Sequence, residues 1–148
     1  MLYAQIHLTL PSWVHEEVDA EKLYPDAASR IALAIDLSRL NVQHRSGGPF
    51  GAAVFSRDGR LLGVGVNRVV PTSCSAAHAE VLALASSQQR TQSYRLNEGG
   101  SRITLATSSQ PCAMCFGALL WAGIDELLVG ATGEDVARVM REPPSLRR

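Results

Sequence analysis

The chain has 148 residues, of which 46% are hydrophobic and 19% are charged; these values are typical of one globular domain, which we expect to span residues 1–148. Fourteen Lys and Arg residues balance fourteen Asp and Glu residues, so the basic excess that is usual in proteins binding duplex DNA or tRNA is absent. No apolar run approaches the ~20 residues of a membrane span, and residues at the N-terminus do not predict a signal peptide.

Hydrophobic periodicity predicts helices and strands in alternation along the chain. Residues 1–25 are expected to form an N-terminal arm, and Asp26 is a suitable cap for the first long helix. The expected elements, in chain order, are a short strand or extended segment at 1–10, a helical turn at 14–18, a helix at 26–44, strands at 50–56 and 61–66, a loop at 67–76, a helix at 78–89, a loop at 91–101, a strand at 103–107, a helix at 111–121 and a strand at 124–129.

The order of these elements predicts an α/β fold. Asp58-Gly59 between the first two strands is a strong hairpin signal, so these strands should pair antiparallel. The last two strands are joined through a helix, which implies parallel pairing. We therefore expect a three-layer α/β/α sandwich with a mixed sheet.

Two short motifs hold most of the residues capable of catalysis. His78-Ala79-Glu80 contributes an imidazole and a carboxylate, and Pro111-Cys112-Ala113-Met114-Cys115 contributes two thiols. Structural zinc sites usually have four protein ligands, whereas catalytic sites keep one position for water. This pattern predicts one Zn²⁺ per chain, with His78, Cys112 and Cys115 as ligands and Glu80 as the catalytic proton carrier.

The helix positions of these motifs set a geometric condition. Pro111 suits the first turn of a helix, which would place Cys112 and Cys115 on one face in that turn, where the helix dipole favours thiolates. Residues two positions apart on an ideal helix point ~200° away from each other. His78 and Glu80 can therefore reach one metal centre only if it lies beyond the N-terminus of their helix.

A closed structural site is the alternative. Cys74 lies four residues before His78 and could complete a set of four ligands. Cys74 also suits a small buried hydrophobic position, and Glu80 would have no role beside a structural zinc ion.

The two motifs resemble the signature of the cytidine-deaminase-like zinc deaminases. Residues 47–54, Asn67 with the segment up to Glu80, and 109–123 resemble the guanine deaminase branch, in particular bacterial enzymes that also accept aminated triazines. The resemblance covers roughly residues 1–136. It implies a five-stranded α/β/α sandwich, an open catalytic zinc site, and attack of water on the amino-bearing carbon of a base, followed by loss of ammonia.

The resemblance also implies a set of substrate-binding residues. The amide of Asn67 would read the edge of the base, the backbone N–H of Ala79 would bind its carbonyl group, Phe50 would stack on it and Trp121 would line the pocket. Each has an ordinary alternative: Asn67 as a turn residue, Phe50 as part of the core, and Trp121 packed against the sheet.

The C-terminal sequence departs from the family. Residues 134–140 could start a helix, and 141–148 form a basic, Pro-rich tail, whereas the family continues with a fifth strand and a region that helps close the pocket. We expect the final strand to be missing or altered, through truncation or a shifted reading frame. A folded but inactive zinc-binding remnant is the corresponding alternative function.

The predicted activity is hydrolytic deamination of a free nucleobase, most simply guanine to xanthine and ammonia. Cytosine, cytidine, ammeline or tRNA adenosine are the alternative substrates. The expected partners are a small base, water and a second copy of the chain in a homodimer, with no nucleic acid or membrane. Three cysteines, two of them with metal spacing, favour a reducing, cytoplasmic setting.

Overall fold

The structure, a computed structural model, describes residues 1–135. Its centre is one mixed sheet with the strand order β2-β1-β3-β4. β1 pairs antiparallel with both β2 and β3, whereas β3 and β4 are parallel. The strands are β1 (Gly51–Phe55), β2 (Leu61–Val66), β3 (Thr104–Ser109) and β4 (Glu126–Ala131).

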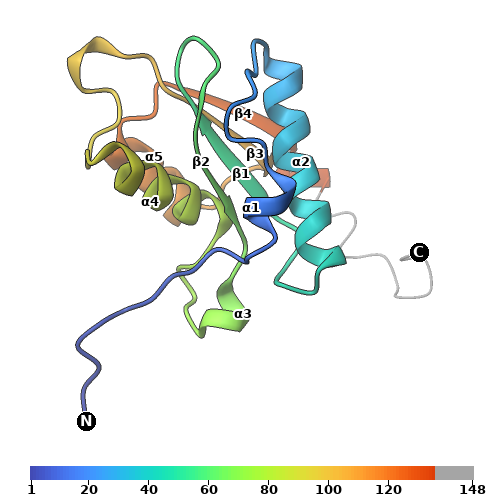
Figure 1. Cartoon of the computed structure of the whole chain (residues 1–148), viewed down its shortest axis with the longest axis vertical. Coiled ribbons are helices and arrows are strands. Elements are labelled where there is room, and N and C mark those ends of the chain that lie inside the picture. Colours follow the sequence, from blue (N-terminus) through green and yellow to red (C-terminus); the bar gives the residue numbers. More distant parts are fainter. Residues whose placement is uncertain (136–148) are drawn as a thin grey trace.

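Helices cover both faces of this sheet, which confirms the α/β/α sandwich. Figure 1 shows α2 on one side of the strands and α4 with α5 on the other. The helices are α1 (Val14–Glu17), α2 (Ala27–Gln43), α3 (Val69–Thr72), α4 (Ala79–Thr91), a short 3-10 helix η1 (Glu98–Gly100) and α5 (Ala113–Ala122). Among residues 1–135, no helix is both long enough and apolar enough to cross a bilayer.

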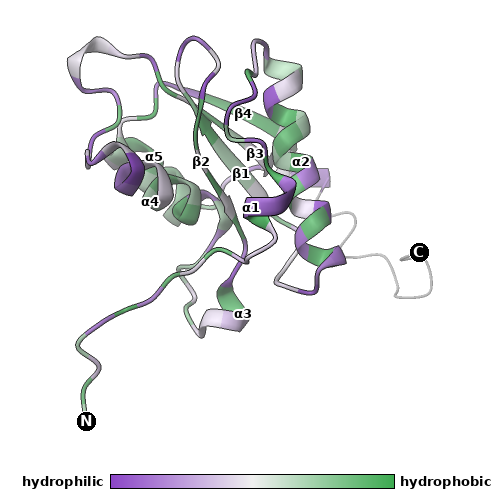
Figure 2. Ribbon diagram, in the orientation of Figure 1, coloured by the Kyte–Doolittle hydropathy of each residue, from purple (hydrophilic) through white to green (hydrophobic). Residues whose placement is uncertain are grey.

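The strands contribute to two hydrophobic cores, one on each face. On β1, Ala53 and Phe55 pack toward α2, and the alternating residues Ala52 and Val54 pack toward α4 and α5. This period of two is the expected geometry of a strand that is buried on both faces. The central strands are accordingly hydrophobic in Figure 2.

Local signals begin α2 and end α5 close to where the sequence predicts. The Asp26 side chain accepts the backbone N–H of Ser29, and the Ser29 hydroxyl returns toward the Asp26 backbone, so α2 begins with a capping box. Gly123 ends α5 with φ 78°, in the left-handed region that favours glycine. Residues between β2 and α4, expected to form a loop, include the short helix α3.

The N-terminal segment is only partly the arm that the sequence predicts. Residues 1–9 extend away from the body without forming a strand (Figure 1). Trp13 and Tyr24, in the same 1–25 segment, are buried in the core on the α2 face. The tail at 141–148 and almost all of the expected helix at 134–140 lie outside the described residues, and the sheet of residues 1–135 has four strands.

Candidate metal centre and substrate cavity

The N-termini of α4 and α5 meet beside the sheet. His78 is the N-cap of α4, and Cys112 is the N-cap of α5, each with an extended backbone. The prediction that α5 begins at Pro111 is therefore wrong by two residues, and Cys115 alone lies in its first turn. Because His78 precedes the helix, its side chain is not held 200° away from that of Glu80. The condition that the site lie beyond the helix N-terminus is met.

The three predicted metal ligands lie together. The Nδ1 atom of His78 is 3.7 Å from Cys112 Sγ and 3.5 Å from Cys115 Sγ. Zinc bonds of about 2.3 Å to sulfur and about 2.0–2.1 Å to nitrogen, at the tetrahedral angle, separate the two donor atoms by about 3.6 Å. The donor set therefore has both the chemistry and the spacing that zinc requires. Cys74 is not part of this cluster among the described residues, so the closed four-ligand arrangement is not present in them.

Glu80 lies between this cluster and the sheet. Its carboxylate is buried, with 7% of the residue exposed. Oε1 accepts a hydrogen bond of 3.0 Å from the Thr107 hydroxyl on β3, and Oε2 lies 3.4 Å from Cys115 Sγ. One carboxylate oxygen is thus anchored to the sheet while the other faces the metal ligands. This is the position that a proton carrier for a metal-activated water would need.

Burial and negative charge act on the Cys115 thiol. Removal from water raises the pKa of Cys115 above its usual range, and the Glu80 carboxylate raises it further. Two helix N-termini lie nearby and favour anions, so they would lower the pKa of Cys115. A bound cation would lower it too. The site is therefore arranged so that thiolate formation and metal binding occur together.

A cavity of about 240 Å³ adjoins the metal ligands. Its lining includes three of the predicted substrate-binding residues, namely Phe50, Asn67 and Ala79, together with Glu80. Ser109 and Gln110 also line it. Neither was predicted from the sequence as a site residue; their position at the end of β3, just before the cysteine motif, was the available signal.

A buried amide holds the part of the cavity wall that carries Phe50 and Asn67. Asn41, which is 0% exposed, donates its two Nδ2 hydrogens to the carbonyl oxygens of Gly48 (2.8 Å) and Asn67 (2.9 Å). The Gly48 carbonyl also accepts the Phe50 N–H. Asn41 thereby joins the two chain segments that carry Phe50 and Asn67. A fully satisfied buried amide of this kind makes the wall rigid.

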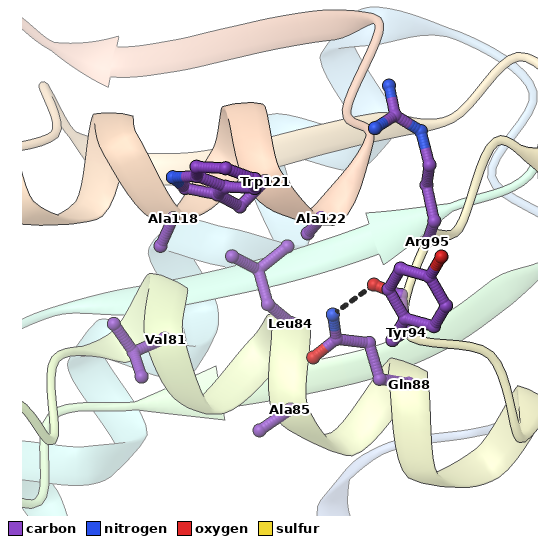
Figure 3. Close-up of a pocket in the computed structure, with 9 residues that line it drawn as sticks. All are labelled: Val81, Leu84, Ala85, Gln88, Tyr94, Arg95, Ala118, Trp121 and Ala122. Atoms are coloured by element: carbon purple, nitrogen blue, oxygen red, sulfur yellow. Dashed lines mark hydrogen bonds between the residues drawn. The ribbon is translucent and has the colours of Figure 1, made fainter.

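Trp121 does not reach this cavity. It lies near the C-terminal end of α5, is 83% exposed and lines a separate groove of about 550 Å³ between α4 and α5. Figure 3 shows its ring above Ala118 and Leu84. The structure therefore does not bring Trp121 to the site, because the length of α5 separates it from Cys112 at the other end.

The family model described as the cytidine and deoxycytidylate deaminase zinc-binding region matches residues 26–131. The chain belongs to this family. It therefore contains a zinc-binding deaminase domain, and its one His and two Cys in the cluster are positioned to bind the metal. The matched range includes every residue of the cluster and of the adjoining cavity.

Curated relatives within this family act on different bases. The chain is 35% identical over 104 residues to guanine deaminase of Bacillus subtilis (70% of this chain and 64% of that protein). It is 34% identical over 90 residues to tRNA-specific adenosine deaminase of Buchnera aphidicola subsp. Schizaphis graminum (61% and 56%). It is 32% identical over 94 residues to a probable cytosine deaminase of Schizosaccharomyces pombe (64% and 54%). The chain thus spans less than two thirds of the length of these relatives.

Solved structures agree with the deaminase fold over most of the chain. A guanine deaminase from Nitrosomonas europaea superposes with a TM-score of 0.86 at 37% identity, covering 94% of this chain and 77% of that one. A mutant protein in complex with 8-azaguanine superposes with a TM-score of 0.86 at 35% identity, covering 99% of this chain and 82% of that one.

Proposed function

We propose that the chain is a zinc-dependent aminohydrolase that converts guanine and water to xanthine and ammonia. The observation that supports this most directly is the cavity next to the three metal ligands, which Glu80, Asn67 and Phe50 line together. A proton carrier, an amide able to read a base edge and an aromatic ring for stacking are the groups that deamination of a flat base needs. The similarity to guanine deaminases favours guanine among the possible bases.

His78, Cys112 and Cys115 would hold the metal, and Glu80 would carry the proton. When bound, zinc supplies the positive charge that lowers the pKa of a water molecule to about 7. Glu80 takes a proton from the attacking water at Oε2, the oxygen that faces the metal ligands, and delivers it to the ring nitrogen of the base. A second proton transfer from the added hydroxyl to the amino group lets ammonia leave and restores the carbonyl.

The cavity wall would bind and orient the base. Asn67 Oδ1 accepts the N–H of Val69 at 3.3 Å, which orients the side-chain amide and leaves its NH₂ group for the substrate. The N–H of Ala79 belongs to the first turn of α4, where backbone donors have no partner within the helix, and it would bind a carbonyl oxygen. Phe50 would stack on the ring.

Ammonia release from guanine by zinc-loaded protein tests this function, with Glu80→Gln as the matched control. The amide keeps the shape of the side chain but cannot accept the proton, so turnover should fall by about 10²–10⁴-fold. Zinc content, measured by mass spectrometry of the metal, should stay at one ion per chain. Activity of Glu80→Gln within a few-fold of the wild type would contradict the assignment of Glu80.

Other bases form the comparison panel. Cytosine and tRNA should be tested in the same assay because relatives of similar identity are named for cytosine and for tRNA adenosine. Ammeline should be tested because the sequence resembles bacterial enzymes that also accept aminated triazines. The balanced formal charge argues against tRNA. Folded, zinc-loaded protein without turnover of any of these substrates would identify an inactive zinc-binding domain.

We also propose a homodimer in a reducing, cytoplasmic setting. Several large apolar side chains of α5 are exposed, including Phe116 (51%), Leu120 (61%) and Trp121 (83%). These side chains lie close together on one helix, and exposed apolar side chains that form a contiguous patch mark an interaction site. Cys74, Cys112 and Cys115 are free thiols, and the metal centre needs two of them reduced.

A further inference from the structure

We propose that Thr107 is a positioning residue that holds the Glu80 carboxylate in the orientation needed for proton transfer; this rests on the function proposed above. Thr107 is not part of either metal motif and does not line the cavity. Its hydroxyl nevertheless contacts Glu80 directly, with Oγ1 at 3.0 Å from Oε1.

Thr107 occupies a rigid position. It lies on β3 and is 1% exposed, and it pairs with Ala52 on one neighbouring strand and Val129 on the other. Because alternate residues of a strand point to opposite faces, Thr107 shares the α4 and α5 face with Leu105, which lies in the core on that side. The hydroxyl is thus held by the central sheet rather than by a loop.

Glu80 needs such an anchor. Its side chain has three rotatable bonds and extends from the first turn of α4 into a buried space next to the Cys115 thiol. The hydrogen bond from Thr107 engages Oε1, so Oε2 faces Cys115 and the other metal ligands. Without this donor, a buried carboxylate oxygen has lost a partner, and rotation of the side chain toward another donor or toward water becomes favourable.

The hydroxyl group of Thr107, rather than its methyl group, makes the contact with Glu80. The Thr107 hydroxyl is within reach of two acceptors, Glu80 Oε1 at 3.0 Å and the Ser109 carbonyl at 2.9 Å. The second contact places the hydroxyl beside the start of the segment that carries Ser109 and Gln110 into the cavity. A valine has the same shape and no hydroxyl, whereas a serine keeps the hydroxyl and loses only the methyl group.

The test compares Thr107→Val, Thr107→Ser and the control Thr104→Val by zinc content, thermal stability and steady-state kinetics with guanine. Thr104 is also a buried threonine of β3 (2% exposed), but its hydroxyl contacts Arg30 and Glu126, away from the site. In Thr107→Val, kcat and kcat/KM should fall together by about 10- to 100-fold, with KM nearly unchanged. Thr107→Ser should keep most of the activity. Thr104→Val should keep wild-type kinetics and zinc content, although removal of the hydroxyl that accepts from the buried Arg30 should lower its thermal stability.

Crystal structures of the wild type and Thr107→Val give a readout that does not depend on activity. We expect the Glu80 side chain to leave its wild-type rotamer in Thr107→Val. An unchanged Glu80 rotamer would overturn the proposal even if the wild type does not act on guanine, whereas a lack of wild-type turnover alone would overturn only the proposed function. Wild-type kcat in Thr107→Val, or equal losses in Thr107→Ser and Thr107→Val, would also overturn it.

Discussion

Cys115 shows at the scale of one residue how burial couples metal binding to protonation. Its thiol is 0% exposed and lies next to Glu80, and burial followed by the Glu80 charge raises its pKa. The neutral thiol is therefore the form that the metal-free fold favours. Zinc requires the thiolate, so binding of the metal must release a proton.

The sign of this shift predicts the pH dependence of the metal-free protein. In the unfolded chain the thiol titrates near its ordinary pKa of ~8.5. Because the folded pKa is higher, the contribution of Cys115 to stability is complete below pH ~8.5 and is lost as the pH rises above it. Denaturant unfolding between pH 7 and 10 should show a steeper alkaline loss in the wild type than in Cys115→Ala. Equal slopes would contradict this account.

The stability of the metal-free protein should fall as the pH rises, whereas its affinity for zinc should increase. This affinity should rise with pH across the same range, because fewer protons then have to be displaced from the ligands. Competition with a chelator at each pH measures this directly.

Close packing between α4 and β2 positions the metal centre at the scale of elements. Gly65 on β2 lies against the first turn of α4, and a Cβ atom there would be 2.0 Å from the Ala79 carbonyl oxygen and 2.3 Å from the Ala83 nitrogen. These are backbone atoms that cannot rotate away. The start of α4, which carries His78 and Glu80, can approach the sheet this closely only because residue 65 has no side chain.

Gly65→Ala should therefore move α4 and disturb the site. Overpacking of this kind typically costs about 1–3 kcal/mol, and the displaced His78 should weaken zinc binding. Gly117→Ala is the matched control: it lies within α5, with nothing within 4 Å of an added Cβ, and should stabilise the helix by about 0.5–1 kcal/mol. Unfolding free energies and zinc affinities of both variants check the prediction. A Gly65→Ala protein with wild-type values for both would show that α4 is not held by this contact.

For the whole molecule, the exposed apolar residues of α5 bear on whether two chains associate. In a homodimer that uses the face near Trp121, Trp121→Ser should remove buried aromatic surface and shift the protein toward the monomer. Val70→Ser, which changes another exposed apolar residue (85%) on α3, is the control. Light scattering coupled to size exclusion reports the mass of each. A wild-type monomer, or equal dimerisation of Trp121→Ser and wild type, would exclude this face as the interface.

Local sequence patterns were sufficient to predict the order of the main elements and the members of the metal cluster. The capping pair Asp26 and Ser29, the Asp58-Gly59 turn and the terminal Gly123 act through local backbone preferences, which a single chain segment carries without its neighbours. Two thiols three residues apart and a remote imidazole predict a metal centre before any fold is known, and the family resemblance supports this prediction.

Tertiary structure alone decided which other residues join the site. Thr107 and Asn41 act through hydrogen bonds to residues 27 and 26 positions away in the chain, and no local pattern encodes such a contact. Trp121 stays outside the site because it lies near the C-terminal end of α5, whereas Cys112 is the N-cap at the opposite end of that helix. Packing of α4 and α5 against one face of the sheet sets these distances, because it brings the two helix N-termini together and leaves the far end of α5 outside the cavity.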